Sequence, residues 1–178
     1  MSTFSTSIND AAVLTAMDAL IKRVNEPQPI LQAVGDDIVE RSKERFTSSA
    51  GPDGQPWAKN SAVTVSRYLV KAGGSFKKNG SLSKKGEARS AGKKPLIGDS
   101  RDLSRQIFAQ ASEASVTVGV SPVYAAIQQF GGTKSNFPKL WGDIPARPFL
   151  PIKPDGTIYP TDEGLIIAQL SKYFAGDL

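Results

Sequence analysis

The sequence predicts a single domain that combines helices with a short stretch of β-strand. Three observations support this fold class. Apolar residues recur at helical spacing near both ends of the chain. At residues 115–120 apolar side chains occupy every second position, as they do in a half-buried strand, and a glycine- and lysine-rich segment separates the first helical pattern from this strand pattern. A length of 178 residues suits one domain, and the apolar content of 39% is ordinary for a soluble globular protein.

The N-terminal part, residues 8–46, predicts two helices. Over 8–24 the apolar side chains follow helical spacing, and Ser7 or Asn9 suits the N-cap position. The Pro-Gln-Pro of 27–29 should end this first helix, because proline has no amide donor. The apolar stripe of the first helix consists of Val13, Met17, Leu20, Ile21 and Val24.

A second helix is predicted from about Ile30 to Phe46. Ile30, Val34 and Ile38 align on one stripe, while charged residues form a solvated outer face. The next segment, 46–59, contains Gly-Pro and Asp-Gly steps that are typical of turns. It lacks the further acids and the terminal glutamate of a calcium loop, so a turn is predicted.

The middle of the chain is strongly basic. Residues 59–105 hold twelve basic and three acidic side chains, a net charge of +9, so the remainder carries −4 of the total of +5. Residues 71–94 contain many glycines and serines but almost no apolar side chains, which is too little to offset the entropy of ordering. We expect a long mobile basic loop at about 71–94. Its candidate contacts to DNA or an acidic partner are Lys71, Lys77, Lys78, Lys84, Lys85, Arg89, Lys93 and Lys94.

Order is expected to return beyond the basic loop, where residues 115–120 form the predicted strand. In the segment 121–132, Ser121 is placed to cap a short helix and Pro122 occupies its first position. The Gly131-Gly132 pair can close that helix in left-handed geometry. The apolar stripe of this helix consists of Tyr124, Ile127 and Phe130.

A last helix is predicted over residues 160–175. Acidic residues in its first turn suit the positive end of the helix dipole. The side chains near one face of this helix are Leu165, Ile166, Gln169, Leu170 and Phe174.

Histidine and cysteine are absent from the sequence. Their absence excludes a Ser-His-Asp triad, imidazole or thiolate metal ligands and a disulfide framework. We therefore expect no catalytic residue, metal or cofactor, and a hydrolase that uses carboxylates such as Glu40 and Glu44 is the least favoured hypothesis. No run approaches the ~18 consecutive apolar residues of a membrane span, so no membrane contact is expected and the chain should fold in a cytoplasm.

The segment DIPARPFLP, residues 143–151, contains three prolines within seven residues. It is too rigid for a flexible linker and too rich in proline for a helix or a central strand. We expect Phe149 and Leu150 to pack inward. Arg147 should be held exposed between prolines as an anchor for a partner, because its guanidinium then loses little entropy on pairing.

Three motifs, PDGQPW, YAAIQQFGG and IPARPFL, occur in this order. The ordered set resembles the phage virion-morphogenesis family, the tail-completion proteins of Mu-like and P2-like phages. The matching stretches run from about Arg45 to Leu150. Members of that family often carry a histidine in the helix before the FGG, where this chain has Gln128-Gln129.

The resemblance implies an α+β protein with a small antiparallel sheet packed with helices. It implies a non-enzymatic structural protein of the phage neck or tail end, which completes or terminates the tail and enables head–tail joining. A tube end must meet a closed symmetric surface, so we expect a self-associating ring around the DNA path, with a hexamer as one candidate size. The expected partners are tail-tube and head-connector proteins in the virion, after assembly in the host bacterial cytoplasm.

The subunit or partner contacts are expected in 121–132 and 143–150. These contact residues are Tyr124, Phe130, Gly131, Gly132, Pro145, Arg147, Pro148 and Phe149. The main alternative is a nucleic-acid-binding module that uses 59–105 to neutralise phosphates. Only Phe76 is aromatic within 71–94, so stacking platforms for bases are missing, and an acidic protein surface fits the same charge.

Overall fold

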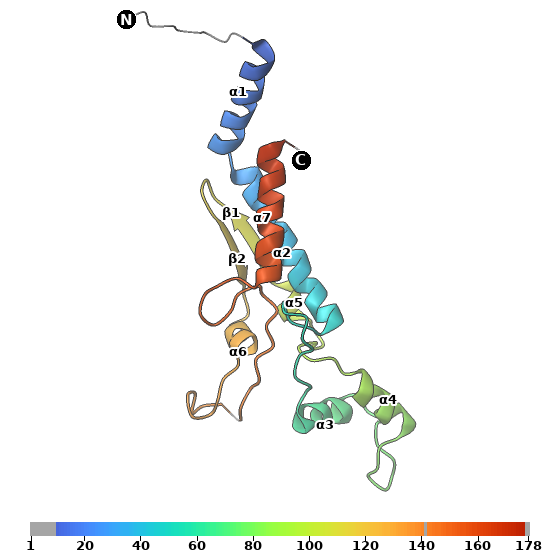
Figure 1. Ribbon diagram of the computed structural model, residues 1–178. Coiled ribbons are helices and arrows are strands. Elements are labelled where there is room, and N and C mark those ends of the chain that lie inside the picture. Colours follow the sequence, from blue (N-terminus) through green and yellow to red (C-terminus); the bar gives the residue numbers. More distant parts are fainter. Residues whose placement is uncertain (1–9, 141, 177–178) are drawn as a thin grey trace, which may run out of the picture.

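The chain folds into an elongated α+β molecule in which a two-stranded antiparallel sheet lies against a long helix (Figure 1). The structure, a computed structural model, describes residues 10–140 and 142–176. None of the helices in that part of the chain is long and apolar enough to cross a membrane. The predicted α+β class is confirmed. The elements in chain order are α1 (Ala11–Asn25), α2 (Gln28–Ser48), α3 (Ala62–Lys71), α4 (Lys84–Gly92), α5 (Asp102–Arg105), β1 (Ile107–Ala111), β2 (Val116–Val120), α6 (Ala125–Phe130) and α7 (Pro160–Ala175).

Helix α2 is the element on which the sheet and the last helix pack. Its predicted stripe of Ile30, Val34 and Ile38 is buried. The helix extends the predicted span by two residues at each end. The Pro-Gln-Pro segment ends α1, as predicted, and it also begins α2, because proline in the first turn of a helix loses no hydrogen bond.

The sheet consists of β1 and β2, which pair from Ile107 opposite Val120 to Ala111 opposite Val116. Strand β2 confirms the strand predicted at 115–120, whereas β1 has no counterpart among the predicted elements. The sheet lies on α2 through the side chains of alternate residues, which is the pattern of a sheet with one covered face.

Gly35 allows α2 to approach the sheet closely. A Cβ atom at this position would lie 2.6 Å from Val116 Cγ2 and 2.8 Å from Ala109 Cβ. Both distances are shorter than a normal carbon–carbon contact of ~3.5–4.0 Å. The helix therefore reaches its position on the sheet because residue 35 has no side chain.

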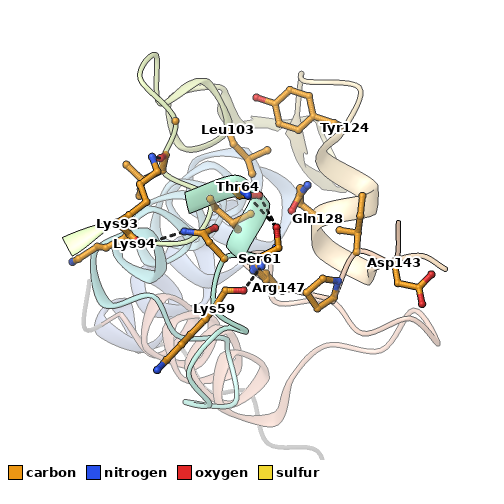
Figure 2. Close-up of a pocket in the computed structure, with 16 residues that line it drawn as sticks. Lys59, Ser61, Thr64, Lys93, Lys94, Leu103, Tyr124, Gln128, Asp143 and Arg147 are labelled. Atoms are coloured by element: carbon orange, nitrogen blue, oxygen red, sulfur yellow. Dashed lines mark hydrogen bonds between the residues drawn. The ribbon is translucent and has the colours of Figure 1, made fainter. Parts of the chain in front are cut away.

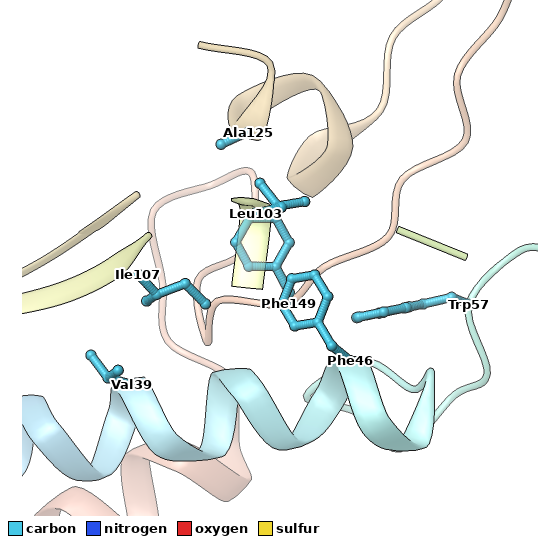
Figure 3. Close-up of a cluster of buried hydrophobic side chains, with 7 residues drawn as sticks. All are labelled: Val39, Phe46, Trp57, Leu103, Ile107, Ala125 and Phe149. Carbon is cyan, nitrogen blue, oxygen red and sulfur yellow. The ribbon is translucent and has the colours of Figure 1, made fainter. Parts of the chain in front are cut away.

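The main hydrophobic core surrounds Phe149, which is 0% exposed, and Figure 3 shows its ring between Leu103 and Phe46. The centroid of the Phe46 ring lies 5.3 Å from that of Phe149 and 5.3 Å from that of Trp57. The Trp57 contact is T-shaped, a favourable geometry for aromatic rings. The inward packing of Phe149 predicted from sequence is confirmed, and Leu150 packs against the same core.

Helix α7 has the bounds predicted from sequence, including the acidic first turn. Its Ile166, Leu170 and Tyr173 pack against the buried stripe of α2. Leu165 and Phe174 were predicted to lie near the same face as these residues but are exposed. The packed face is therefore narrower than the predicted one and leaves apolar side chains of α7 in solvent.

Helix α1 begins after Asp10, whose carboxylate accepts hydrogen bonds from two main-chain amides of the first turn at 2.9 Å and 3.3 Å. The predicted caps Ser7 and Asn9 lie outside the described residues. No residue of α1 is buried, and the predicted apolar stripe, together with Leu14, is between 44% and 57% exposed. Figure 1 shows α1 projecting from one end of the molecule.

The segment predicted as a loop at 71–94 contains a helix, α4, at the end of the molecule opposite α1 (Figure 1). Ser83 Oγ caps α4 by accepting a hydrogen bond from Gly86 N at 3.1 Å. Arg89 donates to Ser75 Oγ and to two carbonyl groups that follow α3. The prediction of a loop is wrong for α4, because these polar bonds supply the order that an apolar core supplies elsewhere. Mobility of this segment stays a prediction.

Replacing Gly35 with alanine should destabilise the protein, because the new Cβ overlaps Val116 and Ala109. We expect the free energy of unfolding, measured by urea denaturation, to fall by about 1–3 kcal/mol. Gly164 on α7 is the matched control, since a Cβ there meets nothing within 4 Å and alanine favours a helix by up to about 1 kcal/mol. Equal stabilities of Gly35→Ala and Gly164→Ala would contradict the close approach.

Candidate subunit-contact site

The proline-rich segment 147–150 is bonded by side chains from other elements. Gln129 on α6 is 3% exposed. Its Oε1 accepts from the amides of Phe149 and Leu150, both at 2.9 Å, and its Nε2 donates to the carbonyls of Leu150 at 3.0 Å and Ile152 at 2.9 Å. All four hydrogen bonds that a glutamine side chain can make are therefore formed. This side chain supplies the bonds that a neighbouring strand would supply in a sheet.

Two further side chains bond the carbonyl groups of the same segment. Trp57 Nε1 donates to Pro148 O, and Arg45 Nη1 donates to Phe149 O, each at 2.9 Å. Trp57 comes from the turn predicted at 46–59, and Arg45 comes from the last turn of α2. The segment is therefore fixed to α2, to α6 and to the turn by side chains rather than by a main-chain ladder.

Arg45 also forms a buried ion pair with Asp162 in the first turn of α7. Arg45 Nη2 lies 2.7 Å from each carboxylate oxygen, and Asp162 is 2% exposed. Arg41 Nη1 lies 3.7 Å from the same carboxylate. A buried charge is tolerated only when it is paired and hydrogen-bonded. One guanidinium thus joins α2, α7 and the proline-rich segment.

Arg147 does not have the exposed position predicted from sequence. It is 7% exposed, its Nε donates to Ala58 O at 2.8 Å, and its Nη2 donates to Lys59 O at 2.9 Å. Burial lowers the pKa of Arg147 below the ordinary value for arginine. The prediction of an exposed anchor is wrong because the chain after Trp57 presents two carbonyl groups to the guanidinium. A contact between Arg147 and a partner stays a prediction.

A groove of about 420 Å³ opens beside Arg147. Figure 2 places Lys93 and Lys94 across this groove from Tyr124 and Gln128. Gln128 Oε1 is buried and finds no hydrogen-bond partner among the described residues. Within the same part of the chain, no three His, Cys, Asp or Glu side chains lie close enough together to hold a metal ion. The groove is basic on one side and polar on the other, which suits an acidic or polar side chain of another protein.

Two glycines after α6 bring the predicted contact segments side by side. Gly131 has a φ of 73°, and a Cβ there would lie 2.8 Å from Ala146 N and 2.9 Å from Ile144 O. Gly132 and Ile144 exchange two main-chain hydrogen bonds, at 2.9 Å and 2.8 Å. The positive φ predicted for the end of this helix is confirmed at Gly131, although its ψ of −179° is extended rather than helical.

Helix α6 is shorter than predicted and buries a different face. It begins three residues after the predicted start, and its buried residues are Ala125 and Gln129. Tyr124 and Phe130 of the predicted stripe are 46% and 43% exposed. The apolar residues face outward because Gln129 occupies the inner face with all its hydrogen bonds made. Tyr124 and Phe130 are thus accessible to a partner, whereas Phe149 belongs to the core.

Four of the eight predicted basic contacts bond within the chain. Lys71 pairs with Asp99, which raises the pKa of the lysine and lowers the pKa of the carboxyl. Lys93, Lys94 and Arg89 donate to main-chain carbonyl groups. The four that remain exposed, with no ion pair to a described residue, are Lys77, Lys78, Lys84 and Lys85.

Four residues that hold the site together were not singled out from sequence: Gln129, Trp57, Arg45 and Asp162. Asp162 was predicted only as one of the acidic residues that suit the helix dipole, and Arg45 was noted only as the start of the stretch that resembles the family. One signal was available for Gln129. Two consecutive glutamines interrupt the apolar spacing of a short helix that precedes a proline-rich segment, and such a segment needs side-chain hydrogen bonds.

The described chain thus combines a proline-rich segment fixed by buried polar side chains, a basic groove and an apolar helix face that it leaves uncovered. The chain belongs to the phage virion morphogenesis family, whose model matches residues 8–174. The resemblance seen in the sequence is thereby confirmed. The protein has a structural role in the phage virion.

The chain is also similar to the Mu-like prophage FluMu G protein 2 of Haemophilus influenzae, with 36% identity over 80 residues. The matched stretch is 45% of this chain and 51% of the relative, so the chain spans about half the length of that curated protein. No solved structure matches the chain.

Replacing Gln129 with leucine should strongly destabilise the protein, because four main-chain groups of the proline-rich segment and its neighbour lose their partner. We expect the free energy of unfolding to fall by at least about 3 kcal/mol in urea denaturation. Gln128→Leu is the matched control, since its Oε1 has no partner among the described residues. Its change should stay within about 1 kcal/mol, and equal losses for both variants would contradict the role of Gln129.

Proposed function

We propose that the protein completes the phage tail at the neck and enables head–tail joining as a ring-forming oligomer. Its family and its similarity to a Mu-like prophage protein support this proposal. The observation that carries the self-association is the uncovered apolar face of α1. This α1 face consists of Val13, Leu14, Met17, Leu20, Ile21 and Val24.

An isolated helix as long as α1, with 15 residues, is only marginally stable in water, and most helices gain stability by burying an apolar face. Helix α1 approaches its own chain at its C-terminal end, where the Arg23 guanidinium lies beside Gly176. We assign the α1 face to a second copy of the chain. Helix α7 of each copy presents Leu165 and Ile167 to solvent, and these side chains offer an apolar surface for α1 of the next copy.

A contact between α1 of one copy and α7 of the next joins different surfaces, so it repeats head to tail from copy to copy and forms a ring when the rotation between copies closes. A closed ring matches the symmetric end of a tail tube and surrounds the path of the DNA. The groove beside Arg147, with Tyr124 at its wall, would then receive a neighbouring subunit, the tail tube or a head-connector protein. Assembly would take place in the host cytoplasm before incorporation into the neck.

Deleting the gene should give full heads and separate tails in electron micrographs, and the wild-type gene should restore joined particles. Joined, normal particles from the deletion would overturn the proposal.

The doubly substituted variant Met17→Gln/Ile21→Gln should fail to restore joined particles, and light scattering should show loss of the oligomer. Both side chains are exposed in the single chain, so its folding should be unaffected. Thr15→Gln/Lys22→Gln on the opposite side of α1 is the matched control and should restore joining.

A second candidate function is favoured by the four exposed lysines near α4, namely contact with the passing DNA. Lys77 and Lys78 lie in the turn between Phe76 and Leu82, which form an isolated β-bridge. Lys84 and Lys85 are the first two residues of α4. Phosphate contacts by these lysines would make binding to random duplex DNA weaken steeply as salt concentration rises. A flat salt dependence would remove this candidate and leave an acidic protein surface as the partner of the lysines.

A further inference from the structure

The outer edge of strand β2 has main-chain groups that point away from the molecule's own sheet. Two hydrogen bonds flank the strand pair, from Ser121 N to Gln106 O at 3.2 Å and from Ser112 N to Ser115 O at 2.7 Å. In an antiparallel pair, bonded and non-bonded positions alternate. With the observed register, Gly119 and Thr117 therefore bond to β1. The outward N–H and C=O groups belong to Val116, Val118 and Val120.

These outward groups have no hydrogen-bond partner among the described residues. Strand β1 has the same alternation on its own outer edge, and there Gln32 Oε1 accepts from Ala111 N at 3.0 Å. The other outward groups of β1, those of Ile107 and Ala109, bond to no residue in the described part of the chain. The outer edge of β2 thus makes no hydrogen bond within the described chain. On β1, Gln32 occupies the edge at Ala111 and Ile107 is only 5% exposed, so Ala109 is the position open to another chain.

Neither strand carries the features that normally prevent edge pairing. The sequences IFAQA and VTVGV contain no proline and no charged residue, and the register has no bulge. A two-stranded sheet is also only marginally stable by itself. Here α2 supports one face through Gly35, so both strands are held extended. Such an edge is a template for another extended chain.

We propose that the outer edge of β2 pairs with the outer edge of β1 from a second copy, so that the sheet continues across the subunit boundary. This inference rests on the ring proposed above. A second copy is the fitting occupant because each chain presents both edges, the strands are equally long at five residues, and both are uncharged. The contact joins two different edges, so it repeats head to tail from copy to copy, which is the type of contact that a ring requires.

Proline at position 118 tests this pairing, because the Val118 amide points outward and is not used in the pairing with β1. Val118→Pro should raise the concentration for half-assembly at least tenfold, measured by light scattering. Val118→Ala is the matched control, since it removes side-chain contacts but keeps the amide. Ala109→Pro on the opposing edge should weaken assembly as Val118→Pro does. Unchanged assembly of either folded proline variant would overturn the pairing and leave the ring in place.

Hydrogen exchange of the wild-type chain gives a second measurement that needs no variant. The outward amides of Val116, Val118 and Val120 should exchange rapidly in the dilute, dissociated chain and at least tenfold more slowly in the assembled ring. Rapid exchange within an intact ring would overturn the pairing alone. A wild-type chain that stays monomeric at every concentration would overturn both the pairing and the ring.

Discussion

The structure depends on the hydrogen bonds that side chains make to the proline-rich segment 147–150. Proline lacks an amide donor, so this segment cannot join a β-ladder, yet Phe149 within it is completely buried. Buried main-chain groups must be paired. Gln129, Trp57 and Arg45 provide the pairing from α6, from the turn after α2 and from α2 itself. The core can form around Phe149 only because these polar side chains are in place.

The same bonds set the positions of the outer elements. Arg45, which bonds Phe149 O through Nη1, also bonds the Asp162 carboxylate through Nη2. This buried ion pair fixes the start of α7 against α2. Gln129 is buried on the inner face of α6, and the side chains of Tyr124 and Phe130 are therefore exposed to solvent, where another chain can contact them. The position of α7 and the exposure of Tyr124 and Phe130 in the proposed ring subunit thus follow from the buried hydrogen bonds of Arg45 and Gln129.

Periodicity predicted the elements whose apolar faces pack within the chain. It located α7 to the residue, α2 to within two residues at each end, and β2. It did not locate β1, although β1 pairs with the next strand in the sequence. It could not locate Gln129, because the main-chain groups that Gln129 bonds lie 20 to 23 residues further along the chain. It also identified the stripe of α1 without revealing that the stripe is uncovered, since spacing alone does not say whether the same chain or another copy buries a face. The Ser83 cap, together with the hydrogen bonds from Arg89 to carbonyl groups that follow α3, explains why α4 forms in a segment with almost no apolar residues.

A segment fixed at several points resists local opening. Amide hydrogen exchange at Phe149 and Leu150 tests this central claim most directly, since both amides donate to the buried Gln129 side chain. These two amides should open only with global unfolding, so that their exchange free energy equals the free energy of unfolding from urea denaturation. Exchange through local opening, at a free energy several kcal/mol lower while the rest of the core stays protected, would contradict it.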